Sequence, residues 1–373
     1  MVRDRFENID LLRAFAAMAV VVYHVIELTH WTSFPTTGPL LTFRIGWIGV
    51  DLFFVISGFV ITHSALALYR QNAGEFKRRY WAHRLSRILP LYLVTCALWI
   101  ALFLPGFFQQ PARLWAQQIF AHLTFTHTFW PATFGSIDGV NWTLGLEMQF
   151  YLTVALLIRW IDRTSGWRIW LSCILIAWTW RASMVFFFGH DDAAGTFMRM
   201  AQLPGTLDEF GAGMFLAKLV EGRSGSQRRV GWGWLVAAVA IGTVCMGIYW
   251  PRASYWDDAA MIVFWHTTLA AFMLCVVASA VYLPAFAERW PTRPVRYLGE
   301  VSYGIYLWHP FAIQACLAMP GITPPAALAA TVGLTVLAAA TSWHVFEKPI
   351  LAYGRRLPGR RVPASGTTER GDA

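Results

Sequence analysis

Two ionisable residues, Arg13 and His24, lie inside the first apolar segment of the chain, residues 9–28. In a helix that turns about 100° per residue, this separation brings the two side chains to within roughly 20° of one another, about 16 Å apart along the axis. One face of the segment therefore carries a fixed cation at one end and a titratable imidazole near the other. Ionisable groups are costly to bury in hydrocarbon and by default indicate a functional site. Because imidazole titrates near neutral pH, His24 is suited to general base catalysis.

The composition indicates that segments of this kind cross a membrane. Hydrophobic residues make up 57% of the 373-residue chain and charged residues only 14%, which is too apolar for a soluble domain. A window of about 20 residues per span finds ten candidates. They are residues 9–28, 46–66, 88–104, 141–160, 169–188, 204–220, 232–250, 258–282, 298–318 and 326–346. The sequence therefore predicts an all-α, polytopic membrane bundle of about ten transmembrane helices.

Basic residues predict how these spans are oriented. An even number of spans places both termini on the same side, and short cytoplasmic loops carry the excess of Lys and Arg. With both termini in the cytoplasm, 25 of the 30 basic residues fall on the cytoplasmic side, so the net charge of +9 is mostly this bias and not a nucleic-acid-binding surface. Residues 351–373 are expected to form a disordered basic cytoplasmic tail. A cleaved signal peptide is the alternative for residues 9–28, and Arg13 within the apolar run argues against it.

The direction of each span converts residue number into depth. His24 lies about 6 Å from the outer end of its span at 1.5 Å per residue. Asp51 lies about 7 Å, and Glu147 about 9 Å, inside the outer ends of theirs. Two further spans bring residues to a similar level: Asp208, Glu209 and His309. We therefore expect a layer of histidines and carboxylates in the outer half of the membrane, where acids orient an imidazole and stabilise its protonated form.

A basic cluster is predicted on the opposite, cytoplasmic side. Residues 77–79 are all basic, and they are followed by Arg84 and Arg87. The i, i+3 spacing points both guanidinium groups the same way at the start of a helix, which suits bidentate contacts with phosphate. The pattern predicts a phosphorylated donor that is bound from the cytoplasm and whose reactive end reaches a base near the outer face.

Each of these residues also has a purely structural interpretation. Topology alone explains a pair of arginines in a cytoplasmic loop. Glu147 could form a structural ion pair with Arg13 or with Arg181. Asp51 could be a helix cap or a packing residue. His309 could be a histidine near the membrane interface whose hydrogen bonds are made within the protein. The functional interpretation of His24 is the stronger one because Arg13 shares its helix face.

Six short motifs occur in order along the predicted spans. They are Asn8-Ile-Asp-Leu-Leu-Arg13 with His24 beyond it, Gly46-Trp-Ile-Gly-Val-Asp51-Leu-Phe-Phe-Val-Ile-Ser-Gly58-Phe, Arg84-x-x-Arg87 before Ile-Leu-Pro90, Asn141-Trp142-Thr143-Leu-Gly-Leu-Glu147-Met-Gln-Phe-Tyr151, Gly299-Glu-Val-Ser302-Tyr303-Gly-Ile-Tyr306-Leu-Trp-His309-Pro310 and Phe346-Glu347-Lys348-Pro349. In these motifs residues 8–350 resemble the acyltransferase 3 family of membrane acyltransferases, in its stand-alone form without an extracytoplasmic hydrolase-like domain. The fourth motif departs mildly from the Ser or Ser-Trp form that is common in the family.

The resemblance implies a reaction and a location. It implies transfer of an acyl group, usually acetyl, from cytoplasmic acyl-coenzyme A to a hydroxyl group, with no metal. The implied acceptor is a carbohydrate or glycoconjugate, such as an exopolysaccharide, a lipopolysaccharide or an oligosaccharide. The implied location is the bacterial cytoplasmic (inner) membrane.

Roles for individual residues follow from the matched positions and from the depth argument. We expect His24 to be catalytic, with a carboxylate, Glu147 or Asp51, orienting it as a base that deprotonates the acceptor. An acyl-histidine intermediate on His24 is the variant of this mechanism. The residues expected to bind the donor are Arg13, Arg84 and Arg87. The residues expected to bind substrate are His309, Trp142 and Tyr151.

Other functions are compatible with parts of this pattern. The acceptor could be a small natural product such as a macrolide. A proton-coupled transporter also uses buried histidines and carboxylates, but it predicts discontinuous helices in two repeated halves, and the sequence has no internal repeat. If the protein were a non-catalytic receptor or scaffold, the presence of Arg13 and His24 within an apolar span would have no functional explanation.

Overall fold

A computed structural model describes residues 6–38, 40–221, 227–249, 258–285 and 292–356, and within these ranges the chain is helical without any strand. The ten long helices are α1 (Glu7–Leu28), α3 (Ile48–Gln71), α4 (Phe76–Phe103), α6 (Trp142–Arg163), α7 (Gly166–Phe188), α9 (Leu203–Val220), α10 (Arg228–Tyr249), α11 (Ala259–Tyr282), α13 (Ser302–Leu317) and α14 (Pro324–Ser342). The short ones are α2 (Leu41–Arg44), η1 (Phe107–Gln109), α5 (Ala112–Leu123), η2 (Gly139–Asn141), α8 (Ala193–Met200), α12 (Arg293–Glu300), η4 (Trp343–Glu347) and α15 (Lys348–Arg356).

Each of the ten predicted spans coincides with one of the long helices. In the described part of the chain, 8 helices are long and apolar enough to cross a membrane. The two that fall outside this set are α9, which carries Asp208, Glu209 and Lys218, and α13, which has only 16 residues. The described part of the chain is therefore an all-α polytopic membrane protein, as predicted, with eight candidate spans where about ten were predicted.

The helices extend into segments that were predicted to be loop or tail. Helix α4 begins at Phe76 and not near residue 88, because the basic residues 77–79 are good helix formers that continue the apolar span backwards. Arg84 and Arg87 consequently lie within a helix and not at its start. The long predicted loop contains η1, α5 and η2. Helix α15 covers the first part of the predicted tail, and residues 357–373 lie outside the described residues.

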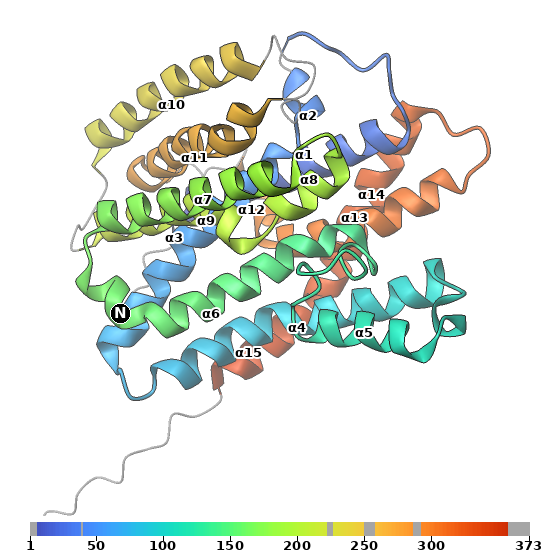
Figure 1. The fold of residues 1–373 in the computed structure, drawn as a ribbon, viewed down its shortest axis with the longest axis horizontal. Helices are drawn as coiled ribbons and strands as arrows, with labels where there is room; N and C mark the ends of the chain where they lie inside the picture. Colours follow the sequence, from blue (N-terminus) through green and yellow to red (C-terminus); the bar gives the residue numbers. More distant parts are fainter. Residues whose placement is uncertain (1–5, 39, 222–226, 250–257, 286–291, 357–373) are drawn as a thin grey trace, which may run out of the picture.

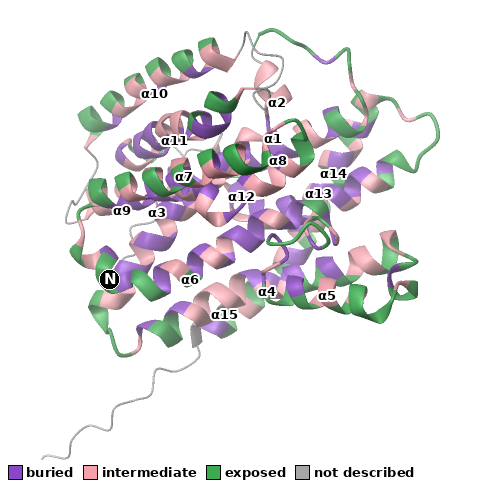
Figure 2. Cartoon of the chain, viewed as in Figure 1, coloured by how far each residue is buried: buried purple, intermediate pink, exposed green. Residues whose placement is uncertain are grey.

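The long helices lie side by side with the most buried ones in the middle. Figure 1 shows α10 at one edge of the bundle and α4, α5 and α15 at the opposite edge, with α1, α3 and α9 between them. Figure 2 shows buried residues concentrated on the central helices and exposed residues along α10. Large apolar side chains on the outer helices are exposed, such as Phe186 at 82% and Val236 at 67%, as expected for surfaces that face lipid.

Helices α3 and α9 cross backbone to backbone at two glycines. A β-carbon at Gly58 would overlap the carbonyl of Phe210 in α9, and one at Gly213 would overlap the backbone of Val55 and Phe59 in α3. Small residues allow such close approach between helices in membranes, where dispersion contacts drive association. The crossing fixes α3 against α9, and each of these helices carries a carboxylate of the site described next.

Candidate functional site

Two cavities inside the bundle divide the predicted site residues between them. The histidine cavity has a volume of about 620 Å³, and its lining includes His24, Asp51, Trp142, Glu209, His266 and His309. The arginine cavity has a volume of about 110 Å³, and its lining includes Arg13, Arg84, Arg87, Glu147, Tyr151 and Ser302. Val50, Phe54 and Tyr306 line both cavities. These three side chains, which we call the partition, therefore lie between a cationic compartment and one that holds histidines and acids.

His24 and His309 form a hydrogen-bonded pair in the histidine cavity. Nδ1 of His24 in α1 lies 3.1 Å from Nε2 of His309 in α13, and the two ring centroids are 5.1 Å apart. His309 is 1% exposed, and its other nitrogen, Nδ1, donates to the carbonyl of Tyr306 over 2.6 Å. We predicted that His309 binds substrate; the described structure shows it as the polar neighbour of the expected catalytic histidine.

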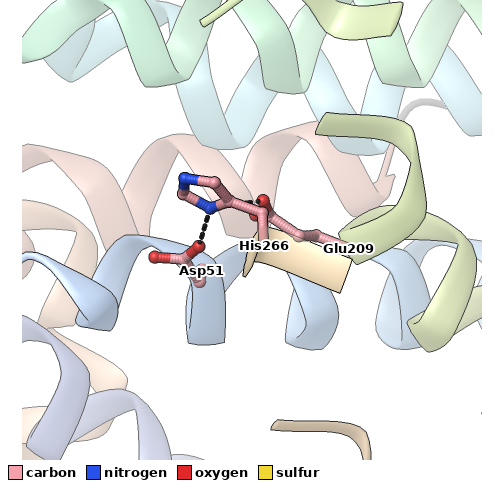
Figure 3. Close-up of side chains that lie close together, drawn as sticks. All are labelled: Asp51, Glu209 and His266. Carbon is pink, nitrogen blue, oxygen red and sulfur yellow. Dashed lines mark hydrogen bonds and ion pairs between the residues drawn. The ribbon is translucent and has the colours of Figure 1, made fainter. Parts of the chain in front are cut away.

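Asp51 contacts a different histidine from the one predicted. Its Oδ1 lies 2.8 Å from Nδ1 of His266 in α11, and the same nitrogen lies 3.3 Å from Oε1 of Glu209 in α9. Figure 3 shows the imidazole between the two carboxylates. No hydrogen bond between Asp51 and His24 is found in the described structure, so the role of Asp51 in orienting His24 stays a prediction, and the contact that the structure shows is with His266. The reason is that α11 brings a second imidazole against α3 at this level.

The same three side chains are candidates for holding a cation. One ligand atom from each of Asp51, Glu209 and His266 lies within 4.8 Å of the others. Carboxylate oxygens and an imidazole nitrogen form a common ligand set for Zn²⁺ or Mn²⁺. In the described structure the imidazole hydrogen bonds to Asp51, so a proton already bridges the two groups.

Glu147 lies in the arginine cavity and not in the predicted layer of histidines. Its Oε1 accepts hydrogen bonds from Tyr151 Oη over 2.7 Å and from Ser57 Oγ over 3.1 Å. Glu147 and His24 line different cavities, with the partition between them, so the role of Glu147 in orienting His24 also stays a prediction. Tyr151, predicted to bind substrate, likewise lines the arginine cavity.

Three guanidinium groups converge on the arginine cavity. Arg13 donates from Nε to Ser302 Oγ over 3.2 Å. Arg84 donates to Ser64 and lies over the rings of Tyr80 and Tyr151, 5.6 Å and 5.2 Å from their centroids. The lining otherwise carries one carboxylate, that of Glu147, so positive charge is in excess. The structure thus brings together all three arginines that were predicted to bind the donor, in a setting that favours an anionic ligand.

Arg181 belongs to a structural pair. It donates two hydrogen bonds to the carboxylate of Asp208, and both side chains are fully buried. Of the alternatives considered for Glu147, pairing with Arg181 is thus excluded. Trp142, another predicted substrate residue, does line the histidine cavity, with its ring edge-on to Phe54 at 6.0 Å and Phe197 at 5.2 Å.

Two residues of the histidine cavity were missed by the sequence analysis. His266 lies a few residues inside the predicted span 258–282, at the depth of the expected histidine layer, so the depth argument could have found it. Asp138 precedes η2 with a φ of +50° and is 1% exposed, and the backbone amide of Val140 lies beside its carboxylate. Burial raises the pKa of Asp138 to about 7, and the amide of Val140 offsets part of this effect. The features that identify Asp138 are its burial and its positive φ, and neither can be read from the sequence.

Comparison with protein families identifies the class of protein. The model of the acyltransferase 3 family, described as an acyltransferase domain, matches residues 6–344. The chain belongs to this family, and it is an acyltransferase.

Several curated proteins are similar to the chain over most of its length. Nodulation protein 10 of Rhizobium leguminosarum bv. viciae is 28% identical over 95% of this chain and 96% of its own length. The exopolysaccharide production protein ExoZ of Rhizobium meliloti is 30% identical over 86% of this chain and 94% of its own length. The peptidoglycan O-acetyltransferase OatA of Listeria monocytogenes is 24% identical over 94% of this chain. The chain spans 57% of that relative's length and 56% of a Bacillus subtilis relative. No solved structure matches the chain.

Proposed function

We propose that the protein is a membrane O-acyltransferase that moves an acyl group, acetyl in the simplest case, from cytoplasmic acyl-coenzyme A to a hydroxyl of a carbohydrate. One observation carries the proposal: a cavity with three arginines and a cavity with a histidine pair share the partition of Val50, Phe54 and Tyr306. A donor in the first cavity and an acceptor in the second would meet at this partition. The names of the relatives, which include a peptidoglycan O-acetyltransferase and an exopolysaccharide production protein, support a carbohydrate acceptor.

The donor half of the proposal rests on charge. Acyl-coenzyme A carries phosphates at one end and a thioester at the end of a long, flexible arm. Arg84 and Arg87 bind the phosphates in this proposal, since guanidinium groups make strong bidentate contacts with phosphate. Arg13 lies on α1 together with His24 and directs the thioester carbonyl towards the partition. The excess of basic residues around the termini supports the assignment of this side to the cytoplasm.

The acceptor half rests on His24. Its Nε2 takes the proton of an acceptor hydroxyl, the hydroxyl oxygen attacks the thioester carbonyl, and the carbon–sulfur bond breaks. The departing thiolate takes the proton back from Nε2, so that coenzyme A leaves as a thiol and His24 is ready again. Trp142 offers an aromatic face for a sugar ring in the same cavity, and Asp51, Glu209 and His266 offer hydrogen bonds to its hydroxyl groups.

The release of free thiol from acetyl-coenzyme A tests this function. The wild-type protein in liposomes, the His24→Ala variant and the Arg84→Ala variant are compared with and without a crude glycan extract. We expect thiol release that rises with the extract, disappears in His24→Ala and needs more acetyl-coenzyme A in Arg84→Ala. Release that persists unchanged in His24→Ala would overturn the assigned base. If Arg84→Ala binds acetyl-coenzyme A as tightly as the wild type does, the proposed donor site is wrong.

A further inference from the structure

Helix α13 contains a proline, Pro310, at a position where its missing N–H matters. In an α-helix the N–H of residue i donates to the carbonyl of residue i−4, and proline has no N–H to donate. The carbonyl of Tyr306 therefore has no donor at position 310. The same carbonyl accepts a hydrogen bond over 2.6 Å from Nδ1 of His309. An imidazole thus occupies the acceptor that the proline leaves open.

This hydrogen bond determines where the proton lies on His309. A carbonyl oxygen can only accept, so Nδ1 of His309 carries a hydrogen. The ring is buried, and its polar neighbours are the carbonyls of Tyr306 and Ile305 and the ring of His24, without a carboxylate. A buried imidazole without a counter-charge is neutral. Nε2 of His309 is therefore a lone-pair acceptor.

The proton position on His24 follows from that on His309. Nδ1 of His24 lies 3.1 Å from the lone pair of His309 Nε2, so it is the donor of this hydrogen bond. The carbonyl of Val20, one turn earlier in α1, also accepts from the His24 ring, and a carbonyl four residues earlier is reached by Nδ1, as His122 and Gln118 show in α5. The remaining nitrogen, Nε2, is left with a lone pair on a half-buried ring that lines the histidine cavity.

We propose that Pro310 and His309 are positioning residues, which hold His24 as the tautomer protonated at Nδ1 and so present Nε2 as the base. The hydrogen bond made by one imidazole nitrogen fixes the role of the other. Here a main-chain carbonyl, freed by a proline, performs the orienting role that a carboxylate performs in a Ser-His-Asp triad. The statement about the tautomer stands on hydrogen bonds alone, and its consequence for catalysis rests on the proposed function.

The tautomer can be read directly by ¹⁵N NMR of histidine-labelled full-length protein in lipid nanodiscs. His24→Ala identifies the His24 signals by their loss. In the wild type we expect Nδ1 of His24 to be the protonated nitrogen and Nε2 the unprotonated one. Pro310→Ala restores an N–H donor to the Tyr306 carbonyl, so we expect both tautomers of His24 to appear. Pro90→Ala, which removes the proline inside α4, is the matched control and should leave the His24 signals unchanged.

A His24 ring protonated at Nε2 in the wild type would overturn the proposal. So would a Pro310→Ala protein in which the tautomer of His24 stays as it is in the wild type. If Pro310→Ala does not fold, the wild-type spectrum alone decides.

The kinetics of two His309 variants test the positioning role separately from the role of the ring in packing. His309→Phe keeps a ring of similar size but offers no acceptor, whereas His309→Gln keeps an acceptor oxygen near the position of Nε2. We expect kcat for thiol release to fall roughly 10- to 100-fold in His309→Phe, by analogy with residues that orient the histidine ligands of metal ions, with KM for acetyl-coenzyme A unchanged. His309→Gln should recover much of the loss.

Equal losses in both variants, or a change in KM instead of kcat, would count against the positioning role. Absence of His24-dependent release in the wild type would instead reject the proposed function and leave the NMR result standing.

Discussion

Arg181 holds the carboxylate of Asp208 through two parallel hydrogen bonds of 3.0 Å and 2.8 Å, in a part of the bundle where neither side chain is exposed. The guanidinium also donates to the carbonyls of Gly205 and Val263, over 2.8 Å and 3.1 Å. One arginine from α7 therefore ties together α9 and α11. Both carboxylate oxygens of Asp208 accept hydrogen bonds from Arg181, whereas the carboxylate of the neighbouring Glu209 lies beside His266.

We predict that Arg181→Leu destabilises the protein by about 3–5 kcal/mol, because it leaves a buried carboxylate without its cation. The double variant with Asp208→Leu should lose much less, since no charge is then stranded. Thermal unfolding of the three proteins in the same detergent measures the effect. Losses that simply add in the double variant would mean that the two residues act independently.

Arg84→Ala should weaken the binding of the donor. A hydrogen bond to a charged group contributes about 1.5–3 kcal/mol, which corresponds to a rise of roughly 10- to 100-fold in KM for acetyl-coenzyme A. Arg78→Ala is the matched control, because Arg78 lies in the same helix but is exposed, 3.6 Å from Glu75. Titration of thiol release against acetyl-coenzyme A separates the two. Equal effects of both variants would point to general surface charge and not to a site.

Asp138→Asn should change how stability depends on pH. The pKa of Asp138 is raised to about 7 by burial, above the value of about 3.9 for an unfolded chain. The folded protein thus binds the extra proton between these values, and stability falls as pH rises from about 4 to 7, by up to about 4 kcal/mol. Asp138→Asn has no carboxyl group to titrate, so its stability should not fall in this way. Asparagine also tolerates the positive φ at this position.

His127 makes the protein more stable as pH rises, over part of the range in which Asp138 makes it less stable. Burial and the neighbouring His122 lower its pKa to about 4, so the unfolded chain, with a value of about 6.5, binds the extra proton. Stability from this group rises between about pH 4 and 6.5. The difference between the unfolding midpoints of wild type and Asp138→Asn at each pH removes this contribution. A difference that does not grow towards pH 7 would contradict the assignment.

Gly213→Ala should disturb the contact of α9 with α3, because its β-carbon would overlap the backbone of Val55 and Phe59. Backbone cannot be moved aside as a flexible side chain can, and overpacking costs about 1–3 kcal/mol. Gly233→Ala in α10 is the control, because no atom lies within 4 Å of its added carbon. Unfolding midpoints compare the two. If both alanines are tolerated equally, the helices do not cross as closely as described.

Removal of metal ions should leave activity unchanged. Asp51, Glu209 and His266 are placed to bind a cation, but the thioester is already activated and the proposed base is His24, so the reaction needs no Lewis acid. We expect equal thiol release before and after treatment with a chelator. A loss that a divalent cation restores in the wild type, but not in Glu209→Gln, would make the three residues a metal site.

Periodicity and composition were sufficient to predict the helices but not the neighbours of individual side chains. Every predicted span is a helix, because runs of about 20 apolar residues leave the chain no other way to satisfy its backbone in lipid. Glu147 shows the limit of the depth argument: height along a span is known from the sequence, but the direction of the side chain around the axis is not. At a similar predicted depth, Asp51 points into one cavity and Glu147 into the other.

The histidines show a second limit. His24 was recognised because it shares a face with Arg13, whereas His266 stands alone in its apolar run and only its depth could have marked it. Its role becomes visible only when α11 is packed against α3 and α9. His309 was recognised, but its hydrogen bond to Tyr306 depends on the path of one carbonyl beside Pro310, which no pattern of residue types reveals.

The partition of Val50, Phe54 and Tyr306 also bears on the energy supply of the cell. A water-filled passage through the bundle would let protons leak down the membrane potential, which is worth about 2.3 kcal/mol per charge for every 100 mV. Two apolar side chains and one tyrosine ring are unfavourable surroundings for an ion. In the proposed reaction the acyl group passes to the acceptor and one hydrogen passes to coenzyme A, so the two cavities exchange one neutral group for another. Acylation of the carbohydrate therefore requires no net movement of charge across the partition.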